Sequence, residues 1–157
     1  MTEFNGKVVL ITGATSGLGA TAAITLAAKG AKVAITGRRE ELGQAVLRQI
    51  DAAGGEGIFI KTDVNVRDDV ERMVAMTVDR FGRLDGAVNN AGITPGPFTP
   101  VADIPDENWF ATLNTNLNAV FWSMKFEIPA MLASGGGAIV NISSIYGLIG
   151  GDIGNAA

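Results

Sequence analysis

The stretch Thr12-Gly13-Ala14-Thr15-Ser16-Gly17-Leu18-Gly19 follows an apolar run, Val8 to Ile11, and opens an alanine-rich helical pattern. This context predicts a glycine turn between a strand and a helix. A helix that begins at such a turn presents unpaired N–H groups and the positive end of its dipole, where a pyrophosphate can bind. We expect Gly13 to allow the sharp turn, Gly17 to leave room for a phosphate and Gly19 to let the helix lie close to the sheet. The alternative is a strand-to-helix turn that binds nothing, and three spaced glycines in this position disfavour it.

The 157 residues have the composition of one compact globular domain, since 47% are hydrophobic and 18% are charged. The net charge is −4 and there is no cluster of basic residues, so the features of a nucleic-acid or anionic-membrane binder are missing. No apolar run has the length of a membrane span and the first residues lack a signal-peptide pattern, so a cytoplasmic location is expected. The absence of cysteine and histidine excludes disulfides, Cys/His zinc sites and a Ser-His-Asp triad, and no metal site is expected.

Short β-branched runs alternate with helical patterns along the chain, which is typical of repeated βαβ units and of a parallel sheet covered on both faces. The predicted fold is a single α/β domain over residues 1–157, with a doubly wound parallel sheet in three α/β/α layers. The predicted strands are Val8–Thr12, Lys32–Thr36, Gly57–Thr62, Leu84–Asn89 and Ala138–Ser143. The predicted helices are Gly17–Lys29, Glu40–Ala53, Arg67–Phe81 with Asn65 as its cap, and Asp106–Met131, bent or ended by Pro129.

A proline-rich segment follows the fourth predicted strand, because four of the five prolines lie in Thr94–Pro105. Proline lacks a backbone N–H and interrupts regular structure, so an irregular loop at the rim of the sheet is expected. Loops of this kind usually shape the access of a ligand.

The end of the second predicted strand, Thr36-Gly37-Arg38-Arg39, is the place where dinucleotide-binding folds distinguish their cofactors. An acid there accepts the ribose hydroxyls of NAD(H), whereas an arginine accommodates the 2′-phosphate of NADP(H). With two guanidinium groups and no acid, NADP(H) is favoured and NAD(H) is the second candidate. The alternative is that Arg38 and Arg39 are solvated residues at the start of a helix.

Further polar residues end the other predicted strands at the same edge of the sheet. Asp63 follows the third strand, where its carboxylate could accept a hydrogen bond from an adenine amino group, or could belong to an ordinary loop. Asn89-Asn90-Ala91-Gly92 ends the fourth strand with two amides and two small residues, which suits close approach to a ligand but also an ordinary turn. Ser143 and Ser144 end the fifth strand, where a hydroxyl could point at a substrate.

Asn116 lies, by helical spacing, inside an apolar stripe of the last predicted helix. A buried amide needs hydrogen-bond partners, so Asn116 is either a structural pin or part of a polar network. The stripe consists of Trp109, Leu113, Leu117, Val120, Phe121 and Met124.

Four ordered motifs resemble those of the short-chain dehydrogenase/reductase family, and the match covers essentially the whole chain. They are Thr12-Gly13-x-x-x-Gly17-x-Gly19, Asn89-Asn90-Ala91-Gly92, Asn116-Leu117 and Ile139-Val140-Asn141-Ile142-Ser143-Ser144. The resemblance implies the strand order 3-2-1-4-5, with NAD(P)(H) lying across the carboxyl ends of the strands.

The resemblance also implies roles for single residues. In this family a serine orients the substrate carbonyl, a tyrosine transfers the proton, a lysine lowers the pKa of that tyrosine, and an asparagine holds a water in the proton relay. The serine corresponds to Ser144, with Ser143 as the alternative if the register is off by one, and the asparagine corresponds to Asn116. The implied cofactor-binding positions are Gly13, Thr15, Ser16, Gly17, Leu18, Gly19, Arg38, Arg39, Asp63, Val64, Asn90, Ala91 and Gly92.

One part of the family pattern, the Tyr-x-x-x-Lys pair, is not found in these residues. The only tyrosine, Tyr146, is followed four positions later by Gly150. Without a general acid beside a cation, a proton step that is typically worth about 10²- to 10⁴-fold is lost. We therefore expect the chain to be the amino-terminal portion of a longer enzyme and inactive by itself, with the sheet truncated after strand five and that strand left as an exposed edge.

These patterns favour an NADP(H)-preferring oxidoreductase that interconverts a carbonyl and a secondary alcohol by hydride transfer. Its expected partners are a small-molecule substrate and further copies of itself in a homodimer or homotetramer, because the family pairs its fourth and following helices. One alternative is a non-catalytic dinucleotide-binding or scaffold protein of the same fold. Another is an S-adenosylmethionine-type methyltransferase, which would require an acid where Arg38 stands.

Overall fold

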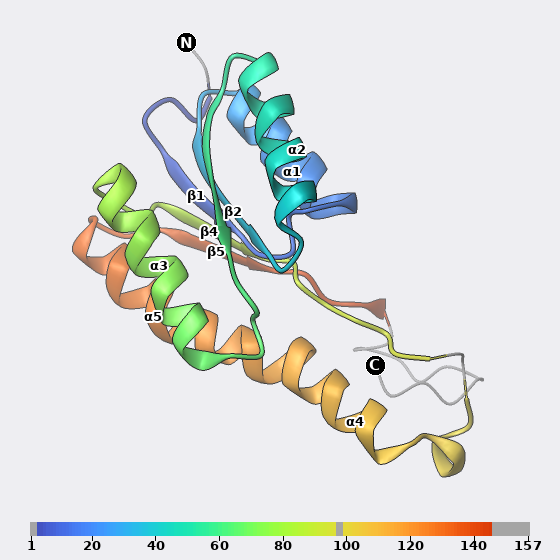
Figure 1. Cartoon of the computed structure of the whole chain (residues 1–157). Helices are drawn as coiled ribbons and strands as arrows, with labels where there is room; N and C mark the ends of the chain where they lie inside the picture. Colours follow the sequence, from blue (N-terminus) through green and yellow to red (C-terminus); the bar gives the residue numbers. More distant parts are fainter. Residues whose placement is uncertain (1–2, 97–98, 146–157) are drawn as a thin grey trace.

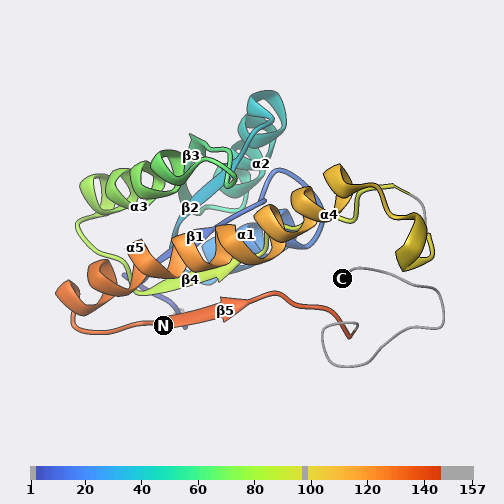
Figure 2. The same ribbon diagram turned by 90° about the horizontal axis from the view of Figure 1, so that it is seen from below.

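The computed structural model describes residues 3–96 and 99–145 and contains one parallel sheet of five strands. Figure 1 shows the whole chain, and Figure 2 shows the strand order β3-β2-β1-β4-β5, so the predicted topology is confirmed. Because β1 lies at the centre and the chain moves outward on each side of it, the carboxyl ends of β1 and β4 are neighbours. The strands are β1 (Val8–Ile11), β2 (Lys32–Gly37), β3 (Glu56–Lys61), β4 (Gly86–Asn89) and β5 (Ala138–Asn141).

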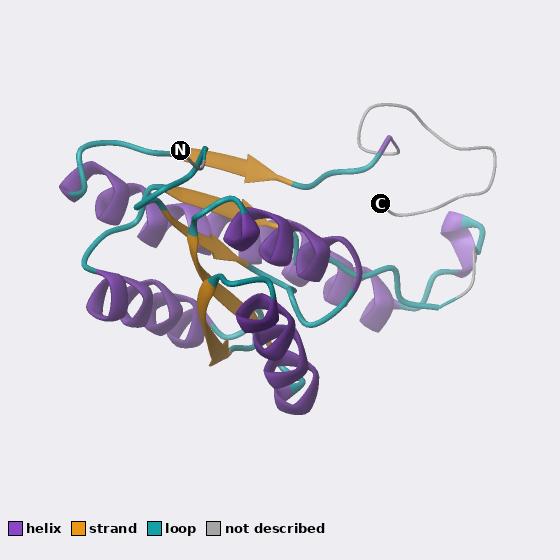
Figure 3. Cartoon of the chain, turned by 90° about the horizontal axis from the view of Figure 1, so that it is seen from above, coloured by secondary structure: helices purple, strands orange, loops and turns teal. Residues whose placement is uncertain are grey.

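Helices cover both faces of the sheet, as Figures 2 and 3 show. Helices α1 (Gly17–Ala28) and α2 (Glu40–Ala52) pack on one face, and α3 (Arg67–Phe81) and α5 (Ala119–Ala133) pack on the other. Each face of the sheet has its own hydrophobic core, and alternate residues of β1 contribute to the two. Val9 and Ile11 face α1 and α2, whereas Val8 and Leu10 face α3 and α5. All four are buried, as expected for a strand that is covered on both sides.

The last predicted helix is divided into three segments. Helix α4 (Asp106–Leu113) leads through a π-helical turn (Asn114–Asn118) into α5, which continues through Pro129 to Ala133. Figure 2 shows α4 extending beyond the carboxyl ends of the strands. The proline-rich segment is not wholly irregular, because Val101–Asp103 forms a 3-10 turn. Among the described residues, no helix is long and apolar enough to cross a membrane.

Three of the six residues of the predicted apolar stripe are exposed, and the other three are only half-buried. Leu117 and Phe121 are 60% and 57% exposed, and Asn116 is exposed as well, so their predicted burial is wrong. Small and polar side chains face the sheet instead. The π-helical turn, which adds one residue to a helical turn, lies within the run of these buried residues. The buried residues of this region are Thr112, Thr115, Ala119, Ser123, Glu127 and Met131.

Candidate functional site: a cavity at the carboxyl edge of the sheet

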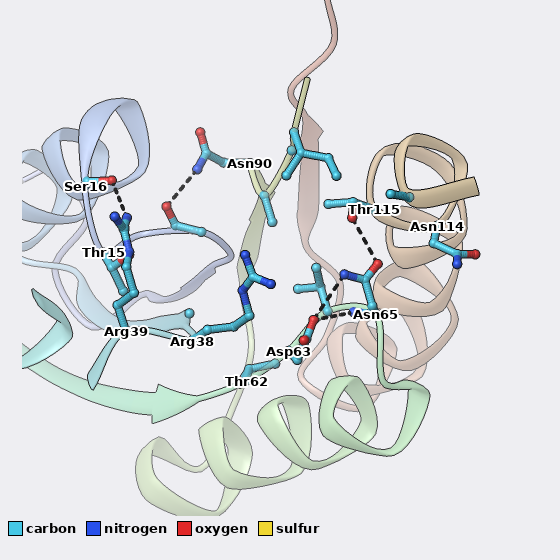
Figure 4. Close-up of a pocket in the computed structure, with 17 residues that line it drawn as sticks. Thr15, Ser16, Arg38, Arg39, Thr62, Asp63, Asn65, Asn90, Asn114 and Thr115 are labelled. Atoms are coloured by element: carbon cyan, nitrogen blue, oxygen red, sulfur yellow. Dashed lines mark hydrogen bonds between the residues drawn. The ribbon is translucent and has the colours of Figure 1, made fainter. Parts of the chain in front are cut away.

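A cavity of about 560 Å³ lies where the carboxyl ends of the strands meet (Figure 4). The loops after β1, β2, β3 and β4 form its walls, and α4 with the π-helical turn closes one side. In an open α/β sheet, ligands bind in this kind of crevice. The cavity is lined by Gly13, Thr15, Ser16, Gly37, Arg38, Arg39, Thr62, Asp63, Val64, Asn65, Asn90, Ala91, Gly92, Ile93, Ala111, Asn114 and Thr115.

The glycine turn between β1 and α1 has the geometry that the sequence predicts. Gly13 has a φ angle of 65°, and a Cβ atom there would lie 2.8 Å from the Cα atom of Ala91. Gly17 has a φ angle of 57°, and a Cβ atom there would meet no protein atom within 4 Å. At Gly19 a Cβ atom would lie 2.5 Å from the side-chain nitrogen of Asn90, so glycine is needed there for close packing.

The amino end of α1 is the feature of this turn that can hold an anion. Helix α1 is twelve residues long, and within the described chain no side-chain hydrogen bond caps its amino end. Its first N–H groups and its dipole therefore remain available to a negatively charged ligand. The hydroxyls of Thr15 and Ser16 stand beside this helix end in the wall of the cavity.

A set of hydrogen bonds fixes the glycine turn to the end of β4. The side-chain Nδ2 of Asn90 donates to the carbonyl oxygens of Thr12 and Gly13, at 2.9 and 3.3 Å. The buried hydroxyl oxygen of Thr12 accepts the backbone N–H groups of Asn90 and Ala91, at 3.0 and 3.1 Å. Thus the two loops that form the floor of the cavity hold each other in place.

The two arginines after β2 occupy different positions in the cavity. The Nη2 atom of Arg39 donates to the hydroxyl oxygens of Thr15 and Ser16, at 2.9 and 2.7 Å, so Arg39 is held against the glycine turn. Arg38 extends into the middle of the cavity, as Figure 4 shows. Gly37, in the segment where an acid would serve NAD(H), packs against Thr15.

A short polar chain links the loop after β3 to the helical wall. Asp63 Oδ1 accepts the backbone N–H and the side-chain Nδ2 of Asn65, at 3.0 and 3.2 Å. Asn65 Oδ1 in turn accepts the hydroxyl of Thr115 at 3.0 Å. Because its side chain makes these contacts, Asn65 does not cap α3, whose N-cap residue is Val66. The predicted cap is therefore wrong.

Asn116 holds the loop after β4 to the π-helical turn. Its Oδ1 accepts the backbone N–H of Ile93 and its Nδ2 donates to the carbonyl oxygen of Ile93, both at 2.9 Å. This agrees with a structural pin, although an exposed one. These bonds use one acceptor position of Oδ1 and one hydrogen of Nδ2, so the side-chain amide of Asn116 keeps one further acceptor and one further donor position. Ser143 and Ser144 follow β5, are exposed, and do not line the cavity of the described chain.

The structure brings together ten of the thirteen predicted cofactor-binding residues, and the other three, Gly17, Leu18 and Gly19, lie in the first turn of α1 and do not line the cavity. Sequence reasoning missed several residues of the helical wall, because their contribution depends on where α4 lies. Thr62 and Asn65 could have been found from their position directly after β3. The lining residues that were not predicted are Gly37, Thr62, Asn65, Ile93, Ala111, Asn114 and Thr115.

The fold and the position of the cavity are those of Rossmann-type proteins, which bind dinucleotides at this edge of the sheet. A family model described as short chain dehydrogenase matches residues 7–156, and the chain belongs to that family. The predicted membership is thus confirmed. Tyr146 and the residues after it, on which the question of the Tyr-x-x-x-Lys pair depends, lie outside the described residues.

Several known proteins are similar to the chain over nearly its whole length. A 3beta-hydroxysteroid dehydrogenase from Mediterraneibacter gnavus is 45% identical over 96% of the chain, and a cyclohexanol dehydrogenase from an Acinetobacter species is 45% identical over 94%. An NAD+-bound xylitol dehydrogenase structure matches 96% of the chain with a TM-score of 0.92 and 32% identity. A metagenomic short-chain oxidoreductase in complex with NADP matches 98% with a TM-score of 0.89 and 36% identity.

The matched proteins are longer than this chain. The chain spans 54% and 59% of the two dehydrogenases, and 58% and 69% of the two solved structures.

Proposed function

We propose that this chain supplies the nicotinamide-nucleotide site of an oxidoreductase that interconverts a carbonyl and a secondary alcohol, with a preference for NADP(H). The observation that carries the proposal is the cavity at the carboxyl edge, which combines an uncapped helix end, two arginines and the Asn90 loop. The names of the two similar dehydrogenases, which specify a hydroxysteroid and cyclohexanol, support an alcohol and its carbonyl as the substrate pair.

The residues present fit such a nucleotide. Gly13 and Gly17 leave the helix end free of side chains, so that the N–H groups of α1, Thr15 and Ser16 would hold the two phosphates. Asp63 and Val64 would contact the adenine. When bound, the nicotinamide supplies or accepts the hydride. Ser144 would orient the substrate carbonyl.

The preference for NADP(H) rests on Arg38 and Arg39. Arg39 is already fixed by the hydroxyls of the glycine turn, and Arg38 reaches into the cavity (Figure 4). Neither Arg38 nor Gly37 provides a carboxylate that would repel a 2′-phosphate. A guanidinium can bind a phosphate through two parallel hydrogen bonds, whereas it gains little from a ribose hydroxyl.

This preference can be measured on the chain with two adenosine ligands that differ only at the 2′ position. We expect adenosine 2′,5′-bisphosphate to bind about tenfold or more tightly than AMP, since charged hydrogen bonds are worth about 1.5–3 kcal/mol. Substituting Arg38→Ala should remove most of this difference in isothermal titration calorimetry. Arg48→Ala is the matched control, because Arg48 is exposed on α2 and does not line the cavity. An unchanged ratio of affinities in Arg38→Ala would contradict the preference. In a longer protein that contains this chain, binding of NADPH with no turnover of any carbonyl substrate would instead favour a non-catalytic dinucleotide-binding protein.

We further propose that the oxidoreductase is a homodimer or homotetramer. The support is the exposed apolar side of α4 and α5, which includes Trp109, Leu117 and Phe121 of the predicted stripe. Large apolar side chains that gather on one side of a helix pair typically mark an interface. Light scattering should give two or four times the mass of one subunit. The exposed residues are Trp109, Phe110, Leu117, Phe121, Ile128 and Leu132.

A further inference from the structure

Glu127, in α5, has a buried carboxyl group that is not paired with a cation in the described chain. Its side chain is fully buried, and no ion pair of the described chain includes it. Its Oε2 atom accepts the side-chain Nδ2 of Asn89 at 3.1 Å. Its Oε1 atom has no partner, and neither has the Oδ1 atom of Asn89. An ionised carboxylate in such a place is costly, because neither a counter-charge nor water compensates for its burial.

One proton would satisfy both orphaned oxygens. A protonated Oε1 becomes a donor, and the acceptor that lacks a donor, Oδ1, belongs to the side chain to which Glu127 is already bonded. A carboxylic acid and a primary amide can each donate one hydrogen bond to the other and accept one in return. An ionised Glu127 would leave two buried acceptors without donors.

We infer that Glu127 is a neutral carboxylic acid below neutral pH, joined by two hydrogen bonds to Asn89, and that it positions the carboxyl ends of β4 and β5. Asn89 is the last residue of β4 and also donates to Asn141 Oδ1, at 2.9 Å, where β5 ends. Asn90, the next residue, holds the glycine turn. Glu127 thereby connects α5 to the segments that carry the nucleotide loop and Ser144. Its effect on the nucleotide rests on the proposed function.

The surroundings of Glu127 offer few charges that could compensate for its ionisation. Strands β4 and β5 contain no titratable residue. On α5, Lys125 lies over the ring of Phe121, and on α3, Arg67 lies over the ring of Phe126. Burial raises the pKa of Glu127 to about 7, and the hydrogen bond from Asn89 only partly opposes this rise.

The expected signature is a loss of stability with rising pH. The folded pKa of Glu127, about 7, lies above the ordinary value of 4.5. Between these two pH values the unfolded chain releases a proton that the folded chain keeps. The contribution of Glu127 to stability is therefore greatest below pH 4.5 and is lost as the pH rises to 7. The unfolding equilibrium constant should rise on the order of a hundredfold from this cause.

Asp85 is the other described carboxyl group with a strongly shifted pKa, and it affects stability outside the pH range from 4.5 to 7. Burial tends to raise the pKa of Asp85, but hydrogen bonds from Arg83, the Val8 amide and Lys7 outweigh it and hold that pKa at about 2. Its contribution is lost only as the pH falls from 3.8 towards 2.

Chemical denaturation from pH 4.5 to pH 8 tests the inference with two glutamine variants. Glu127→Gln keeps a donor and an acceptor for Asn89 but cannot ionise, so it should remain folded and lose most of this pH dependence. Glu71→Gln is the control, because Glu71 is exposed on α3 and its substitution removes the same charge; it should retain the pH dependence of the wild-type chain. If the free energy of unfolding changed with pH in the same way in the wild type and in Glu127→Gln, the inference would be overturned.

Infrared spectroscopy and ligand binding separate this inference from the proposed function. The wild type and Glu71→Gln should show the C=O band of a buried protonated carboxyl at pH 6, and Glu127→Gln should lack it. The ratio of the wild-type affinity for adenosine 2′,5′-bisphosphate to the affinity of Glu127→Gln, both measured at the same pH, should fall several-fold between pH 6 and pH 8. If the wild type binds the nucleotide but lacks this C=O band, or if the ratio of affinities does not change with pH, the inference about Glu127 is overturned and the proposed function is not. The band and the stability profile in a folded chain that binds no nucleotide would refute the proposed function alone.

Discussion

Replacing Gly13 with alanine is expected to weaken the binding of adenosine 2′,5′-bisphosphate about a hundredfold or more. The new Cβ atom would lie 2.8 Å from the Cα atom of Ala91 and 3.1 Å from its nitrogen, and both of these are backbone atoms. The glycine turn and the loop after β4 must then move apart. Because both line the cavity, the phosphate-binding groups are displaced. Losing two charge-assisted hydrogen bonds, at about 1.5–3 kcal/mol each, costs about a hundredfold or more. Isothermal titration calorimetry of the folded variant measures the effect.

Gly54→Ala is the control that separates crowding from backbone strain. Gly54 has a φ angle of 74°, close to the 65° of Gly13, but a Cβ atom there would meet no protein atom within 4 Å, and Gly54 does not line the cavity. Both variants should lose roughly 1–2 kcal/mol of stability from the left-handed backbone conformation. Only Gly13→Ala should lose the ligand. Similar affinities in the two variants would contradict the role given to the turn.

Replacing Thr12 with valine is expected to lower the free energy of unfolding by about 3 kcal/mol, since each buried donor left without an acceptor costs about 1–3 kcal/mol. Valine has nearly the shape of threonine but no hydroxyl. Thr12 is 2% exposed, and the half-buried backbone N–H groups of Asn90 and Ala91, which its Oγ1 accepts, would both lose their partner. Urea denaturation gives the change directly.

Two further threonine variants test the cause of this loss. Thr12→Ser keeps the hydroxyl and should restore most of the stability. Thr77→Val removes an equally buried hydroxyl that only donates, to the carbonyl oxygen of Met73, so no N–H group is orphaned and the loss should stay below about 1 kcal/mol. Equal losses in Thr12→Val and Thr77→Val would show that the orphaned amides are not the cause.

Features that depend on local pattern could be predicted from the sequence. Each βα unit buries its own strand and helix, so the alternation of β-branched and helical stretches was enough to place the strands and helices, with ends that differ by a few residues. The strand order came from the resemblance to a family. The loop residues of the site were found because the carboxyl ends of parallel strands necessarily share one edge.

Features that depend on how distant segments pack could not be predicted in this way. The apolar stripe around Leu117 suggested a buried face, yet the side of α5 that contains Ser123 and Glu127 packs on the sheet. Periodicity identifies an apolar side but not the surface that covers it. The contact between Thr115 and Asn65 joins residues that are far apart in the sequence. A single acid in a mostly apolar helix was the available sign of Glu127.

The central claim, that the cavity at the carboxyl edge holds a nicotinamide nucleotide, is tested most directly by amide NMR of the labelled chain titrated with adenosine 2′,5′-bisphosphate. This ligand carries the adenosine half of the proposed cofactor, and the contacts proposed for that half all lie in the described residues. We expect saturable shifts at the amides of the glycine turn, of Arg38 and Arg39, and of Asn90 and Ala91. A folded chain whose amides at these positions do not respond at millimolar ligand, or respond no more than those of the distant α3 surface, would contradict the claim.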